Sequence, residues 1–175
     1  MLSKFNQIMN TFNLQYFGEV SLNKNSYEED YTSFMHYKGE IIELSLNYEP
    51  EEVSESDFII VQSFFNDFDG KVLEAEQAIL KDYKSSGITK NFIQTHLDTL
   101  TLTGKEILKV TLAKGKQLDQ YFLDELSLNH IWIFPDSADE FIALNFQIST
   151  EFTDEILVVQ FGKDLKFFET RIEFE

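Results

Sequence analysis

The chain has 175 residues, no cysteine, and 14 basic against 31 acidic residues, which gives a formal net charge of −17. The missing cysteines exclude disulfides, thiolate metal sites and a cysteine nucleophile. The charge argues against direct binding of nucleic acid, because phosphate contacts need a lysine- and arginine-rich surface.

Hydrophobic residues make up 43% of the chain, which is the composition of a folded domain. Residues 1–12 lack the uninterrupted apolar segment of a signal peptide, and no stretch approaches the roughly 20 apolar residues of a membrane span. We therefore expect a cytoplasmic protein without membrane contact. Acidic residues concentrate in 1–57 and 117–175, whereas residues 71–116 are mildly basic.

The first part of the chain predicts a strand meander. Residues 1–13 have helical spacing of apolar side chains and predict a short helical extension. Residues 14–22 and 27–37 predict two strands, and residues 41–48 a third. Ile42, Leu44 and Leu46 share one face of the third strand, which is the clean alternation of a half-buried strand.

Helices are predicted after Pro50. Ser54 and Asp57 have the spacing of a capping box, which predicts a helix over 56–68. Apolar periodicity predicts two more over 71–84 and 89–100, and a short one over 117–126. Residues 101–116 fit a hairpin, a poor helix or a loop, and their four lysines make them a basic insertion or lip.

The carboxyl-terminal part predicts strands over 127–134, 140–148, 155–161 and 165–174. The aliphatic run in 155–161 predicts an interior strand. A turn at Gly162 follows, and the alternating pattern in 165–174 predicts a strand at the edge of the sheet. Three strands, then helices, then four strands indicate one α+β domain over 1–175. We expect an antiparallel sheet of about six to seven strands with helices packed on one face. The glutamates on the last strand favour a monomer, since charges on an edge oppose pairing with another copy.

Four short motifs resemble a bacterial domain-of-unknown-function family of small acidic cytoplasmic proteins. They are Phe17-Gly18-Glu19-Val20, the Tyr37-x-Gly39-x-x-Ile42-x-x-x-Leu46 meander, Phe92-x-x-x-His96, and Thr153-Asp154-x-Ile156-Leu157-Val158-Val159. The resemblance covers about residues 14–170. It implies one α+β domain and brings no established activity and no catalytic residues. Small acidic proteins of this kind are often immunity or toxin-neutralising partners, which is an analogy only.

Recognisable catalytic chemistry is absent from the sequence. There is no metal-binding histidine pair at helical spacing, no glycine-rich phosphate loop and no nucleophile elbow. We therefore expect no cofactor, no metal and no enzymatic activity. His36, His96 and His130 are each more typical of satisfied half-buried histidines than of ligands.

The first functional hypothesis is an interaction protein, an immunity-type inhibitor that binds a basic toxin or nuclease. Acidic side chains would mimic phosphates and speed association. The predicted contact surface combines acidic groups with tyrosine anchors. It comprises Tyr27, Glu28, Glu29, Asp30, Tyr31, Glu43, Tyr48, Glu49, Glu51 and Glu52.

Two alternatives stay open at this point. A small-molecule-binding or sensory domain would hold a pocket among its aromatics, with His96, His130, Trp132 and Asp154 around it. A weak enzyme would use His96 and Asp154, although no motif selects that pair.

Overall fold

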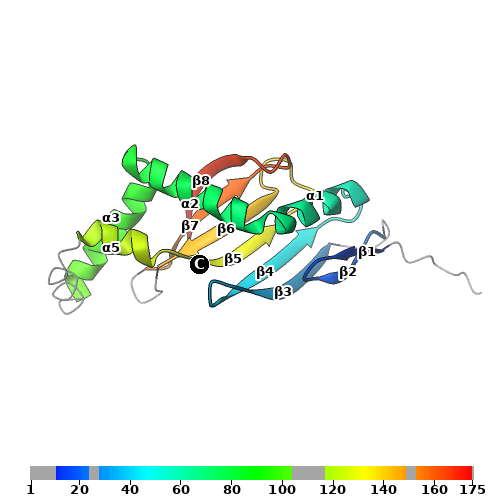
Figure 1. The fold of residues 1–175 in the computed structure, drawn as a ribbon, viewed down its shortest axis with the longest axis horizontal. Coiled ribbons are helices and arrows are strands. Elements are labelled where there is room, and N and C mark those ends of the chain that lie inside the picture. Colours follow the sequence, from blue (N-terminus) through cyan, green and yellow to red (C-terminus); the bar gives the residue numbers. More distant parts are fainter. Residues whose placement is uncertain (1–10, 24–27, 104–116, 149–152, 175) are drawn as a thin grey trace, which may run out of the picture.

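The computed structural model describes residues 11–23, 28–103, 117–148 and 153–174. The fold is α+β, as predicted, with helices packed against a sheet. In chain order the elements are β1 (Thr11–Leu14), β2 (Gly18–Ser21), β3 (Glu29–Tyr37), β4 (Glu40–Tyr48), α1 (Glu55–Asn66), α2 (Phe68–Lys84), α3 (Ile88–Thr103), α5 (Leu118–Glu125), β5 (Ser127–Ile133), β6 (Ile142–Gln147), β7 (Glu155–Phe161) and β8 (Phe167–Phe174). In Figure 1, α1 and α2 run across the front of the sheet.

The main sheet has six strands in the order β3-β4-β5-β6-β7-β8. All neighbouring pairs are antiparallel except β4 and β5, which pair in parallel from Glu43 beside His130 to Leu46 beside Ile133. The predicted antiparallel sheet is confirmed at the other four junctions, and this one junction is parallel instead. The helices between β4 and β5 form a long connection, which is what a parallel pair requires.

The predicted strand over 14–22 is instead a small hairpin of β1 and β2. Tyr16 and Gly18 both have positive φ, which allows the chain to reverse between them. The hairpin packs on α1 through Phe12 against Phe58, with ring centroids 5.7 Å apart, and through Tyr16 against Phe65 at 5.0 Å. Residues 11–13, predicted as helix, therefore lie in a strand, and the rest of that predicted helix lies outside the described residues.

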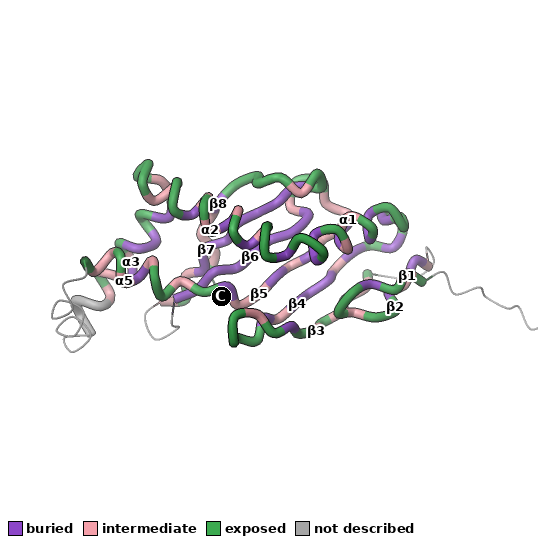
Figure 2. Tube along the Cα trace, in the orientation of Figure 1, coloured by how far each residue is buried: buried purple, intermediate pink, exposed green. Residues whose placement is uncertain are grey.

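Aromatic side chains fill the space between the helices and the sheet. Phe64 of α1 lies 5.5 Å from Phe65, 5.8 Å from Phe68 and 6.5 Å from Phe161, measured between ring centroids. Figure 2 shows that the middle strands are largely buried, as expected for strands beneath this layer. The core is therefore rich in phenylalanine, in keeping with the 18 phenylalanines of the chain.

The helix boundaries differ from the predicted ones in two places. The break between the first two helices falls at Asp67 rather than at Gly70, which lies inside α2. The helix α3 continues to Thr103, so residues 101–103 are not part of a hairpin. The rest of the predicted basic lip, residues 104–116, lies outside the described residues.

The carboxyl-terminal hairpin agrees with the prediction in its main features. β7 lies inside the sheet and β8 at its edge. Two contacts hold the loop between them. Lys163 Nζ lies 2.6 Å from Asp57 Oδ1 on α1, and the backbone N–H of Lys163 donates to the carbonyl of Ala138 between β5 and β6. The apolar face of β8 is less buried than the alternation implies, since Phe168 and Phe174 are exposed at the edge of the sheet.

Within the part of the chain that the structure describes, no helix has the length and apolar character to span a membrane.

Candidate functional site

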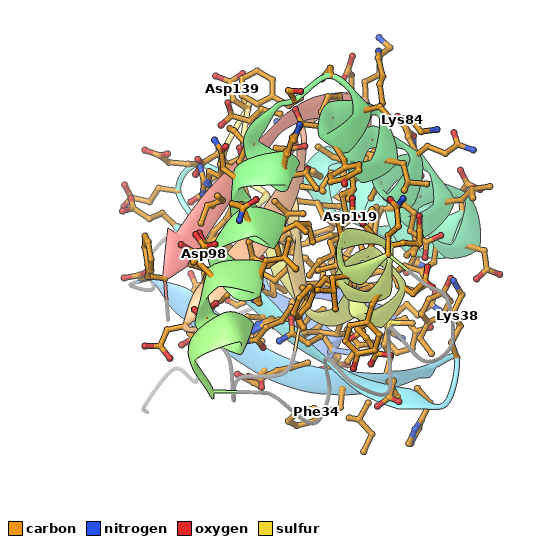
Figure 3. All side chains as sticks on the ribbon, turned by 90° about the vertical axis from the view of Figure 1, so that its left-hand side faces the viewer. Phe34, Lys38, Lys84, Asp98, Asp119 and Asp139 are labelled. Carbon is orange, nitrogen blue, oxygen red and sulfur yellow. The ribbon has the colours of Figure 1, made fainter. Side chains whose placement is uncertain are left out.

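The main sheet has one face that the helices cover and one face that the described helices leave uncovered. Figure 3 shows Phe34 projecting from the side of the sheet opposite the helices. The buried side chains on this side form a separate small cluster of Ala143, Ile156 and Val158 with Trp132, all from strands. We call this side the open face. Strand parity and register assign to it Asp30, Thr32, Phe34, His36, Ile41, Glu43, Ser45, Asn47, His130, Trp132, Ala143, Asn145, Gln147, Ile156, Val158, Gln160, Glu169, Arg171 and Glu173.

Three aromatic rings form a row that begins on β5 at the open face and ends at Phe134, directly after the strand. The His130 ring stacks on Trp132 with 4.5 Å between centroids, and Trp132 stacks on Phe134 at 5.9 Å with the rings nearly parallel. The ring of His130 is fixed by a 2.9 Å hydrogen bond between its Nε2 and the hydroxyl of Ser45 on β4. The row therefore has a defined geometry before any ligand binds.

Large apolar side chains are also exposed on this face. Phe34 is 60% exposed and Ile41 is 63% exposed, on the neighbouring strands β3 and β4. Glu43 pairs in register with both Phe34 and His130, so on β4 it lies between Phe34 and the ring row. The combination of exposed apolar groups with aromatic rings is typical of a protein-interaction surface.

The open face is acidic. Its one arginine, Arg171, binds Glu140 and Glu173, and the guanidinium holds the pKa of Glu140 below its ordinary value. Asp30, Glu43 and Glu169 carry no ion pair with a described residue. The acidic surplus is thus free to act on a ligand.

Amide side chains on the open face hold polar atoms that are buried without a partner in the described structure. Asn145, 5% exposed, has an unpaired Oδ1, and the fully buried Gln160 has an unpaired Oε1, although its Nε2 donates to Glu140. Asn47 Oδ1 is also unpaired on β4, and so is the oxygen of Asn129 at a bulge of β5. The one unpaired donor among these amides is Gln147 Nε2, so unpaired acceptors predominate.

The structure brings together residues from two separate predictions. Asp30 and Glu43, predicted for the partner surface, share the open face with His130 and Trp132, predicted for the alternative pocket. The other predicted acids, Glu28, Glu29, Glu49, Glu51 and Glu52, lie before or at the start of β3 and between β4 and α1. Tyr27 lies outside the described residues.

The tyrosines of the predicted partner surface need correction. Tyr48 is 2% exposed, and its hydroxyl donates to the carbonyl of Ser21 at 2.7 Å. Its ring stacks on Tyr31, whose hydroxyl donates to Glu29 and accepts from the Ser21 N–H. Burial raises the pKa of Tyr48. These tyrosines fasten β2 to the main sheet on its helix side, so Tyr48 cannot anchor a partner.

The structure does not assemble the predicted alternative pocket. His96 is buried on α3 between Phe92 and Phe122, whereas His130 and Trp132 lie on β5 on the open face. Its Nδ1–H donates to the Phe92 carbonyl at 2.8 Å, and its Nε2 accepts from the Thr153 hydroxyl at 3.1 Å. With both nitrogens engaged, His96 has a structural role in this geometry. Asp154, next to Thr153, is exposed.

We predict that His96 makes the fold sensitive to mild acid. Burial lowers the pKa of His96. Below about pH 6.5 the unfolded chain then binds more protons at this histidine than the folded chain does. The contribution of neutral His96 to folding stability is therefore fully present above that pH and is lost as the pH falls through the folded pKa. Chemical denaturation between pH 5 and 7 should show a free energy of unfolding that rises with pH, and a shallower rise in His96→Gln.

The exposed His36 on β3 supplies the control for that experiment. His36→Gln should keep the pH dependence of the wild-type protein. Equal slopes in the wild-type protein and His96→Gln would contradict the prediction.

A groove of about 340 Å³ lies between α2 and β8. Side chains of Glu74, Lys81 and Asp82 line it together with Phe167 and Thr170. The Thr170 hydroxyl is buried there without a described partner. None of the four residues predicted for a pocket lies in this groove, so the small-molecule alternative stays a prediction without the site first assigned to it.

In the described part of the chain, no group of three or more histidine, aspartate or glutamate side chains is arranged to hold a metal ion. Comparisons with protein-family models, with curated proteins and with solved structures give no match. The resemblance drawn from the sequence motifs therefore stays a prediction.

Proposed function

We propose that this chain is a protein-interaction module that binds a basic protein partner through the open face. The observation that carries the proposal is a sheet face, uncovered by the described helices, that combines a fixed ring row with unpaired carboxylates. Exposed aromatic and apolar side chains provide the area that a partner can bury. The acids Asp30, Glu43 and Glu169 provide complementarity to a basic surface and faster association at low salt.

An immunity-type inhibitor, which blocks a basic toxin or nuclease, is the role that fits this chemistry. A nuclease presents a basic surface to nucleic-acid phosphates, and an acidic face can occupy that surface in their place. The net charge of −17 also supports a basic partner, because it repels other copies of this chain and attracts positively charged proteins.

The test is affinity capture from host lysate with three baits of known charge. The first bait is the wild-type protein, and the second carries Asp30→Lys with Glu43→Lys on the open face. The third carries Glu51→Lys with Glu52→Lys, the same charge change on the exposed segment between β4 and α1. We expect a basic protein on the first and third baits, released as salt rises, and binding weakened about tenfold or more on the second.

Two results would contradict this assignment. A partner lost from the third bait but kept by the second would move the contact surface to the segment before α1. A partner that all three baits retain at high salt would remove the acidic surface as the basis of recognition.

A further inference from the structure

The outer edge of β8 is available to a further strand. β8 is the last strand of the main sheet, so no described strand pairs with the backbone groups on its outer side. Figure 1 shows β8 in red at one margin of the sheet. We infer that an extended segment of a basic partner, in which apolar and basic residues alternate, adds to this edge as a new strand. The inference rests on the proposed function for the basic character of the partner, and it adds a second contact surface.

Side chains along β8 are accessible to such a segment. Phe167, Phe168 and Phe174 are 41%, 51% and 73% exposed. An exposed edge strand with large apolar side chains is a template for pairing with another chain. At one end of β8 the N–H of Phe167 already donates to Glu74 of α2 at 3.4 Å, so pairing with a new strand begins beyond this residue.

The opposite edge of the sheet is less available. There the β1–β2 hairpin packs against β3, because the Ser33 hydroxyl donates to the Tyr16 carbonyl at 2.7 Å and the Tyr31 hydroxyl accepts from the Ser21 N–H at 3.0 Å. A new strand can therefore reach β8 without displacing the hairpin.

The groove between α2 and β8 lies on the helix side of this edge. Phe167 pairs in register with Phe161, whose ring contacts Phe64 of α1, so Phe167 belongs to the helix side of β8. The groove is lined by Phe167 and by α2 residues that include Ala78, whose short side chain leaves room there. Pockets beside a sheet edge select the alternate side chains of an added strand. The surfaces of Ala78 and Phe167 favour an apolar side chain.

Acidic side chains border the other side of the edge. By strand parity, Glu169 and Glu173 belong to the open face. Arg171 lies between them and already binds Glu140 and Glu173, whereas the exposed Glu169 carries no ion pair with a described residue. A basic residue of an added strand can therefore pair with Glu169. Another copy of β8 would bring its own glutamates to this edge, which charge repulsion opposes.

The two sides of the edge together define a sequence pattern. Successive residues of a strand point to opposite faces, so a segment that fills the groove and pairs with Glu169 must alternate apolar with basic residues. The test compares capped peptides of equal composition in which lysine and valine either alternate or form two blocks. Fluorescence anisotropy of the labelled peptides should give about tenfold tighter binding of the alternating peptide.

A third peptide tests the main-chain hydrogen bonds. It has the alternating sequence with a methyl group on each backbone nitrogen, which removes the N–H donors and keeps the charge. We expect it to bind about tenfold more weakly than the unmethylated peptide, because it lacks the donors that pair with an edge strand.

Hydrogen exchange locates the bound peptide on the sheet. The alternating peptide should slow exchange of backbone amides within Phe167–Phe174, because outward N–H groups of β8 gain a partner. Exchange within β3 should stay as it is in the free protein. Slower exchange in β3 alone would place the peptide at the opposite edge and overturn the inference.

Two variants test the two sides of the edge. Ala78→Leu fills the groove and should weaken binding of the alternating peptide about tenfold, and the helix is kept because leucine is a good helix former. Glu169→Lys should weaken binding about threefold to fivefold, as expected for an exposed ion pair. Asn66→Leu at the end of α1 and Glu51→Lys before α1 are the exposed controls, and both should bind as the wild-type protein does.

The outcomes separate the inference from the proposed function. Equal affinity for the alternating and block peptides, or unweakened binding of the methylated peptide, overturns strand addition and leaves the open face as the surface for a basic partner. Unchanged binding in both Ala78→Leu and Glu169→Lys overturns the placement at β8. Binding of the alternating peptide at β8 by a protein whose three baits capture equally would keep the edge site and remove the open face.

Discussion

Phe64→Ala should lower the free energy of unfolding by about 3–5 kcal/mol, the range for truncation of a fully buried phenylalanine. The Phe64 ring is completely buried and contacts the rings of Phe65, Phe68 and Phe161. It thus joins α1, the start of α2 and the interior strand β7. Truncation removes apolar surface and leaves a cavity that three rings surround. Chemical denaturation followed by circular dichroism measures the effect.

Phe174→Ala is the matched control, because Phe174 is 73% exposed at the end of β8. The same truncation there should change the free energy of unfolding by no more than about 0.5 kcal/mol. A loss below about 1 kcal/mol for Phe64→Ala would mean that the packing between α1 and the sheet is not the main source of stability.

Asp57→Ala should lower the free energy of unfolding by about 2–3 kcal/mol, because one buried carboxylate joins two parts of the fold. Asp57 Oδ2 accepts hydrogen bonds from the N–H and the hydroxyl of Ser54 at the start of α1, both at 2.8 Å. Its Oδ1 lies 2.6 Å from Lys163 Nζ in the β7–β8 loop. The substitution leaves Ser54 and Lys163 without this partner.

The pH dependence of stability gives a second measurement on Asp57. Burial alone would raise its pKa, but the contacts with Lys163 and Ser54 lower the pKa of Asp57 below its ordinary value. This contribution to stability is therefore present above about pH 3.9 and is lost as the pH falls through the folded pKa. In Asp57→Ala, the free energy of unfolding, measured by chemical denaturation, should fall less over this acidic range than it does in the wild-type protein.

Asp164→Ala supplies the control, since Asp164 is an exposed carboxylate that pairs with Lys166 in the same loop. This substitution should leave the unfolding midpoint nearly unchanged, because exposed ion pairs contribute little. Equal effects of Asp57→Ala and Asp164→Ala would show that burial of the carboxylate does not matter.

Much of the fold follows from local patterns in the sequence. The alternation over residues 41–48 gives β4, and the aliphatic run gives β7 with the predicted bounds Glu155–Phe161. The Ser54 and Asp57 spacing gives the start of α1. The hairpin of β1 and β2 was missed because it turns at Tyr16, whose positive φ is rare outside glycine and is held by packing on Phe65.

The candidate site could be predicted only in pieces. Glu43, His130 and Trp132 are each recognisable as candidates, but residues far apart in the chain meet through the register between β4 and β5. No local pattern fixes the register of two distant strands. Burial of Tyr48 did have a signal, because Tyr48 shares its strand face with Ile42, Leu44 and Leu46.

The amides of the open face also had a signal that the sequence interpretation left unused. Asn145 and Gln147 alternate with Leu144 and Phe146 on β6, and Gln160 interrupts the aliphatic run of β7. Polar groups at buried positions are the informative exceptions in a strand. Whether their oxygens find partners depends on neighbouring strands, which only the three-dimensional structure supplies.

The single parallel junction has a consequence for the order of folding. The strands β5 to β8 follow one another along the chain, so their pairing closes short loops, and β3 with β4 forms another local hairpin. Joining β4 to β5 closes a loop that contains all the described helices, which carries a larger entropic cost. The two halves of the sheet can therefore gain structure before they meet. Glu43 and His130 lie on opposite sides of that junction, so we expect the open face to be completed only when the two halves of the sheet pair.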